Sequence, residues 1–104
     1  MASYMAIEDL RKAVDIPKDN TVSRVIHQDA RAKFVVLGLA GGQEISSHTV
    51  ALATAVQVLE GQVRFSLDGE ENELATGAWV FLEANVQHAV YARSDAILLL
   101  TLLQ

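Results

Sequence analysis

The sequence predicts an all-β domain, a sandwich or barrel of short strands, preceded by a short N-terminal helix. Runs of apolar and β-branched residues follow one another from residue 21 to the C-terminus, with Gly, Asn and Asp between them. After Pro17 no helical stretch is long enough to connect parallel strands. The 104 residues, 51% of them hydrophobic, suffice for one core. We therefore expect a helix and lead-in over residues 1–18 and one barrel domain over residues 19–104.

The N-terminal helix is predicted by the spacing of apolar residues between Ser3 and about Asp15. Ile7, Leu10 and Val14 fall on one face of a helix, with acidic residues early in the segment and basic residues later. Pro17 lacks a backbone N–H and ends the helix.

The strands are predicted from apolar runs and from the turn residues between them. Asp19-Asn20, Asp68-Gly69 and Ala84-Asn85 each indicate a turn. The run from Phe34 to Leu39 is almost continuously apolar, as in a strand that is covered on both faces. The expected strands cover residues 21–26, 34–39, 49–59, 63–67, 78–82, 86–92 and 96–103.

Composition excludes several classes of function. The net charge is −5 and the basic residues are scattered, so the chain has no basic surface for nucleic acid or anionic membranes. The absence of cysteine excludes disulfides and thiolate metal ligands. The longest apolar run, Ala96 to Leu100, is too short to span a bilayer. A cytoplasmic protein is the expectation.

Two blocks of glycine and histidine resemble the paired motifs of the cupin superfamily. The first runs from Gly42 through His48 to Gly61, and the second runs from Gly77 to His88. The resemblance covers roughly residues 20–103. It implies a double-stranded β-helix, a jelly-roll barrel with a pocket at one end.

The family's metal-binding members hold a divalent cation with three histidines and a glutamate, and this chain keeps two of these four residues. His48 and His88 match the first and last histidines, whereas Val50 and Thr54 stand at the positions of the second histidine and the glutamate. A transition metal normally takes at least three protein ligands. We therefore expect no cofactor, with a divalent metal on His48 and His88, helped by His27 or water, as the alternative.

Strand alternation predicts which side chains line a pocket inside the barrel. The predicted lining consists of His48, Val50, Thr54, Val56, Phe65, Trp79, Phe81 and His88. Such a lining is mostly apolar with a few polar groups, which is typical of ligand sites. The alternative is that the apolar residues of this set simply fill the barrel as part of its core.

Two functions follow from this pocket. The first is binding of a small molecule in the barrel. The alternative is a metal-assisted enzyme of the dioxygenase, isomerase or lyase type that uses His48 and His88, or a metal-free enzyme in which the pair acts as general acid and base. Whether the chain is an enzyme stays open.

The last expected strand, residues 96–103, is apolar on both faces. A sheet that faces water on one side should show polar residues there, so another element must cover it. The N-terminal helix and a second subunit are the two candidates, and we predict a homodimer.

Overall fold

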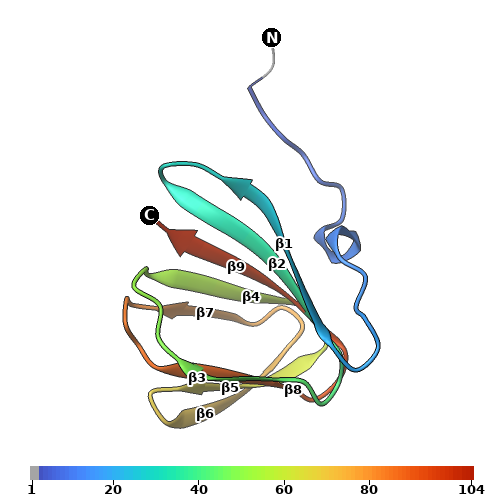
Figure 1. Cartoon of the computed structure of the whole chain (residues 1–104), viewed down its shortest axis with the longest axis vertical. Coiled ribbons are helices and arrows are strands. Elements are labelled where there is room, and N and C mark those ends of the chain that lie inside the picture. The colour runs from blue at the N-terminus through green and yellow to red at the C-terminus, as the bar shows by residue number, and fades with distance from the viewer. Residues whose placement is uncertain (1–2) are drawn as a thin grey trace.

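The structure is a computed structural model that describes residues 3–104. In these residues one 3-10 turn is followed by nine strands (Figure 1). Their bounds are η1 Leu10–Ala13, β1 Thr21–Gln28, β2 Ala32–Leu39, β3 Glu44–His48, β4 Thr54–Glu60, β5 Gln62–Leu67, β6 Glu70–Ala75, β7 Trp79–Leu82, β8 His88–Ala92 and β9 Ala96–Leu103. The predicted all-β class is confirmed. None of the described helical residues forms a helix that is long and apolar enough to cross a membrane.

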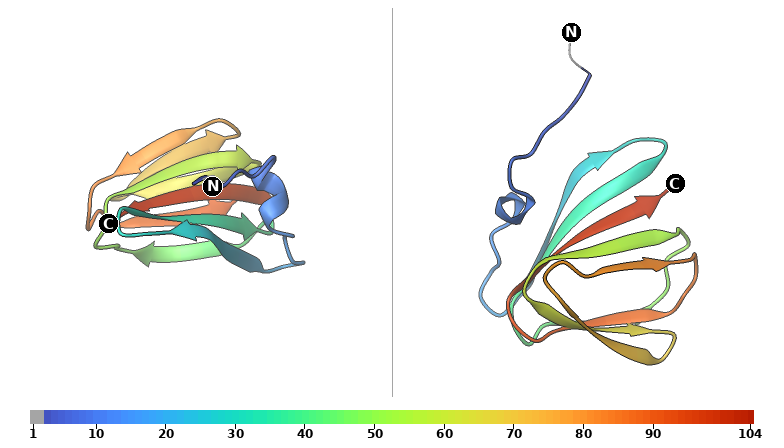
Figure 2. Two further views of the ribbon diagram at one scale, coloured as in Figure 1. Left: turned by 90° about the horizontal axis from the view of Figure 1, so that it is seen from above. Right: turned by 180° about the vertical axis from the view of Figure 1, so that it is seen from behind.

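The strands form two antiparallel sheets that face each other (Figures 1 and 2). The five-stranded sheet has the order β1-β2-β9-β4-β7, and the four-stranded sheet has the order β3-β8-β5-β6. Strands that follow one another in the chain often lie in different sheets, as in a jelly roll. The expected double-stranded β-helix is therefore confirmed.

The core lies between the two sheets and consists of side chains that alternate along the strands. Phe65 from the four-stranded sheet and Val58 and Leu98 from the five-stranded sheet are almost completely buried there. Their neighbours along each strand point to the outer faces, because successive side chains in a strand alternate. Burial of apolar side chains between the sheets is the main stabilising contribution to such a fold.

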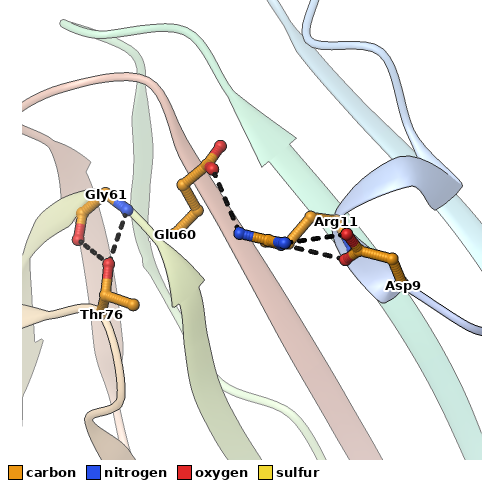
Figure 3. Close-up of polar contacts among 5 residues, drawn as sticks. All are labelled: Asp9, Arg11, Glu60, Gly61 and Thr76. Carbon is orange, nitrogen blue, oxygen red and sulfur yellow. Dashed lines mark hydrogen bonds and ion pairs between the residues drawn. The ribbon is translucent and has the colours of Figure 1, made fainter.

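Gly61 allows the chain to pass from β4 in one sheet to β5 in the other. Its φ of 90° is a left-handed conformation that glycine adopts without strain. Its N–H donates to the Thr76 hydroxyl at 3.1 Å (Figure 3). A Cβ at this position would lie 2.9 Å from the Ala96 Cα. The sharp turn and the close approach of β9 therefore both depend on glycine.

The prediction of a helix from Ser3 to Asp15 is wrong in its extent, since only Leu10–Ala13 forms a single 3-10 turn. Of the three apolar residues that predicted the helix, Leu10 and Val14 pack against the sheet, whereas Ile7 is 39% exposed. A helix of this length is marginal without packing along its whole face.

Arg11 links the 3-10 turn to the end of β4. Its guanidinium donates to both carboxylate oxygens of Asp9, which is the N-cap of the turn, and lies 4.0 Å from the Glu60 carboxylate (Figure 3). The hydrogen bonds from Arg11 hold the pKa of Asp9 at about 2, below its ordinary value. The turn thus has a defined position on the five-stranded sheet.

The N-terminal segment covers one end of that sheet's outer face. Val14 is buried against Val36 of β2 and Ile97 of β9, and Leu10 and Ile16 pack beside it. The N-terminal segment therefore covers part of the outer face of β9, the last strand, which was predicted to be apolar on both faces. Farther along the same strand, Leu103 is 45% exposed.

The observed strands differ from the predicted strands in three places. Glu44–His48 forms β3 and Glu70–Ala75 forms β6, and neither was predicted as a strand. Residues 49–53, expected to belong to one long strand that reaches 59, lie outside any strand, and β4 begins at Thr54. β3 and β6 are the edge strands of the four-stranded sheet and are mostly exposed, so their hydrophobic pattern is weak.

Candidate functional site

A cavity of about 90 Å³ lies between the two sheets, near one end of the barrel. Six of the eight predicted pocket residues line it, namely His48, Val50, Thr54, Val56, Phe65 and His88. Its walls are otherwise aliphatic, and none of the described charged side chains lines it. Any molecule inside is therefore in a largely apolar environment in which the two histidines supply most of the polar groups.

The two histidines are neighbours because β3 pairs with β8, with a shift of register between Ile45 and His48. His48 at the end of β3 is directly opposite His88 at the start of β8, and the ring centroids are 4.2 Å apart with the planes tilted by 55°. His88 is only 8% exposed and lies parallel to the ring of Phe65, at a centroid distance of 6.1 Å. His48 is exposed. The pair therefore extends from the barrel interior to its mouth.

Both imidazoles are held by the same kind of hydrogen bond. The Nδ1 of His48 lies 2.9 Å from the carbonyl oxygen of Ser46, and the Nδ1 of His88 lies 3.0 Å from that of Val86. A carbonyl oxygen can only accept, so Nδ1 carries the proton in each ring. In the neutral imidazole the lone pair is then on Nε2, and the hydrogen bonds of both rings to described residues are made by Nδ1 alone. The site presents two adjacent hydrogen-bond acceptors.

Thr54 and Val50 line the cavity beside the two histidines without adding a metal ligand. Thr54 is 3% exposed and its hydroxyl donates to the Leu52 carbonyl at 3.0 Å. Val50 lines the cavity with an aliphatic side chain. Across residues 3–104, no three His, Cys, Asp or Glu side chains lie close enough together to hold a metal ion. The donor set around the histidine pair does not fit a divalent metal with three or more protein ligands.

The predicted pocket members Trp79 and Phe81 lie outside the cavity, and this part of the prediction is wrong. They are 62% and 42% exposed, and their rings stack on each other at a centroid distance of 6.3 Å. In the pairing of β4 with β7, Thr54 is opposite Leu82 and Val56 is opposite Val80. Residues directly opposite each other share a face, so Val80 and Leu82 point inward and the two aromatic residues point outward.

Several aliphatic residues that form much of the cavity wall were not predicted from the sequence. These are Leu37 of β2, Ile45 of β3 and Leu98, Leu100 and Leu102 of β9. The alternation along 96–103 would have indicated one of two faces, but both faces of that strand are apolar. The missing information was which face points inward.

The other candidate polar groups lie away from the cavity. His27, the suggested additional metal ligand, pairs with Asp29 at 3.0 Å near the far end of β1. Glu44 and Glu83 are both exposed and do not line the cavity. The chemistry of this site therefore rests on His48, His88 and Thr54.

Comparison with known proteins identifies the family. The profile of the Cupin domain family matches residues 34–103. A conserved protein of unknown function from Streptococcus pyogenes superposes with a TM-score of 0.87 at 28% identity, over 99% of this chain and 90% of that one. An RmlC-like cupin protein from Desulfovibrio desulfuricans superposes with a TM-score of 0.85 at 26% identity, over 96% of this chain and 97% of that one.

A cupin superfamily protein from Desulfitobacterium hafniense has a TM-score of 0.85 at 18% identity, over 90% of this chain and 86% of that one, and this shows the fold alone. No curated protein matches the sequence. The matched family profile spans β2 to β9 and includes both histidines and the cavity. The chain belongs to the cupin family.

Proposed function

We propose that this protein binds a small, largely apolar molecule that carries a hydrogen-bond donor, such as a hydroxyl group. The observation that supports this function is the pair of Nε2 acceptors of His48 and His88 at the mouth of an aliphatic cavity. Acceptors in an apolar site favour a ligand that can donate to them, because an unpaired polar group there loses its hydration without compensation.

The cavity volume limits the size of the buried part of the ligand. An engineered apolar cavity of about 150 Å³ takes up benzene. The cavity of about 90 Å³ therefore fits a short alkyl chain or part of a ring. The exposed position of His48 leaves room for the rest of the molecule at the mouth.

Calorimetry with matched ligand pairs tests the proposal. Short-chain alcohols are compared with the methyl ethers of the same carbon skeleton, which can accept but not donate a hydrogen bond. We expect the alcohols to bind about tenfold more tightly, since one net hydrogen bond contributes about 1.4 kcal/mol. His88→Phe should remove this preference, while His27→Phe, which lies outside the cavity, should retain it. Equal affinity for alcohols and ethers, or no binding of either class, would contradict the proposal.

A further inference from the structure

A polar hollow of about 140 Å³ opens on the outer face of the four-stranded sheet, and we call it the outer hollow. Small residues form its floor, since Ser66 of β5 is directly opposite Ala89 of β8. Larger side chains form its walls, namely Glu44 of β3, Arg64 of β5, Glu71 of β6 and Tyr91 of β8. In contrast to the cavity inside the barrel, the outer hollow therefore combines an aromatic wall with charges of both signs.

Arg64 is stacked on Tyr91 and makes no hydrogen bond to the residues that the structure describes. The two residues are directly opposite each other in the pairing of β5 with β8, and the guanidinium carbon lies 4.9 Å from the centroid of the phenol ring. Its Nε is 3.9 Å from the Glu71 carboxylate, which is beyond hydrogen-bond distance. Stacking on an aromatic ring orients the guanidinium plane and leaves the N–H groups at its edge available. Arg64 therefore offers a positioned set of donors to a ligand.

Arg93 approaches the same ring and provides a comparison. Its guanidinium carbon lies 5.6 Å from the centroid of Tyr91, and its Nε donates to the Glu73 carboxylate at 2.6 Å. This hydrogen bond raises the pKa of Arg93 above its ordinary value. Arg93 does not line the outer hollow. Of the two arginines beside Tyr91, one is therefore paired within the protein and the other faces the hollow.

The charges around the outer hollow favour a ligand that carries both signs. A simple anion would meet the carboxylates of Glu44 and Glu71, and a simple cation would meet the guanidinium of Arg64. Glu44 is opposite Tyr91 in the pairing of β3 with β8, so Glu44 and Arg64 flank Tyr91 on neighbouring strands. Their Cα atoms are then about 10 Å apart, which is two strand spacings. A zwitterion between them can pair its negative group with Arg64 and its positive group with Glu44.

The size of the outer hollow fits a small amino acid. A cavity of about 150 Å³ takes up benzene, so the hollow of about 140 Å³ has room for a molecule with a similar number of heavy atoms. We propose that the outer hollow binds a free α-amino acid, whose carboxylate accepts hydrogen bonds from Arg64 and whose ammonium group donates to Glu44. Arginine and carboxylate pair through two parallel hydrogen bonds, and hydrogen bonds between charged groups are stronger than those between neutral ones. The site is separate from the histidine pair.

Titration of the intact chain with L-alanine, followed by ¹H–¹⁵N NMR, tests the proposal. The backbone amide signals of Ser66, Ala89 and Tyr91 should shift and reach saturation, while the signal of Leu98, which lines the barrel cavity, stays in place. N-acetyl-L-alanine lacks the ammonium group and L-alaninamide lacks the carboxylate, so each should bind at least about tenfold more weakly. Equal affinity for L-alanine and either derivative, or no saturable shift with L-alanine, would overturn the proposal.

Paired variants test which side chains hold the ligand. Arg64→Gln should weaken the binding of L-alanine at least about tenfold, whereas Arg93→Gln, which removes the same charge beside the same ring, should retain it. Glu44→Gln should also weaken binding, and Glu70→Gln, at an exposed position outside the outer hollow, should not. Binding that Arg93→Gln removes and Arg64→Gln leaves unchanged would refute the assignment of the carboxylate to Arg64.

Discussion

At the scale of single residues, His48 and His88 were predicted from motif spacing to belong to one site, and the structure places their rings 4.2 Å apart. Their neighbours decide what the pair can do. Val50 and Thr54 add no third ligand, and Thr54 already donates its hydroxyl proton to the Leu52 carbonyl. Two fixed imidazoles without a third ligand are suited to accepting hydrogen bonds rather than to holding a metal.

Restoring the two missing ligands should create a metal site. We expect the double variant Val50→His and Thr54→Glu to be purified with close to one divalent metal ion per chain, measured by mass spectrometry of the metal content. The intact chain should carry well under one ion per chain. The control is Val50→His with Thr54→Gln, which has almost the same shape without the carboxylate and should bind metal more weakly. A full equivalent of metal on the intact chain would contradict this reading of the site.

Gly61→Ala should lower the free energy of unfolding by about 3 kcal/mol or more. Its Cβ would overlap the carbonyl oxygen of Asp95, in addition to the strain of a left-handed φ. Gly69→Ala is the matched control, since Gly69 has a similar φ of 84° but open space around the Cβ position. Only the conformational cost, about 1–2 kcal/mol, applies there. Urea denaturation measures both values, and equal losses would argue against the close approach of β9.

At the scale of elements, sequence patterns predicted the strands that have strong apolar character and failed where exposure weakens the pattern. Phe34 to Leu39 and Ala96 to Leu103 fall within or match observed strands, because burial on both faces gives long apolar runs. β3 and β6 were missed because edge strands contribute few buried side chains. The alternation at Trp79 and Phe81 was visible, but alternation alone does not tell which face is inside.

The hairpin that joins β1 and β2 should lose stability in acid through Asp29. Hydrogen bonds from the Arg31 guanidinium and N–H, with a further contribution from His27, hold the pKa of the Asp29 carboxyl well below its ordinary value. A lowered pKa in the folded state means that the stabilisation is complete above the unfolded-state pKa of about 4 and is lost as the pH falls below it.

The test of that pH dependence is the melting temperature of Asp29→Asn between pH 7 and pH 3. The variant should melt below the intact protein at pH 7, and the difference should shrink as the pH falls below about 4. Asp15→Asn is the control, since the exposed Asp15 makes no hydrogen bond or ion pair among residues 3–104. A difference that stays constant down to pH 3 would show that the charge of Asp29 does not stabilise the hairpin.

At the scale of the whole molecule, the fold explains the cavity. The two sheets enclose a small apolar space whose mouth carries the histidine pair. The barrel could be predicted from turn residues and motif spacing. The position of the N-terminal segment could not, because Leu10 and Val14 owe their conformation to packing on the sheet rather than to local helix propensity.

The central claim, that the Nε2 atoms of the histidine pair accept hydrogen bonds from a ligand in the cavity, is tested most directly by ¹⁵N NMR of the imidazole rings. In a titration with a short-chain alcohol, the Nε2 signals of His48 and His88 should shift with ligand concentration, while their Nδ1 signals and both signals of His27 stay in place. Binding that leaves both Nε2 signals unchanged, or that shifts only Nδ1, would contradict the account.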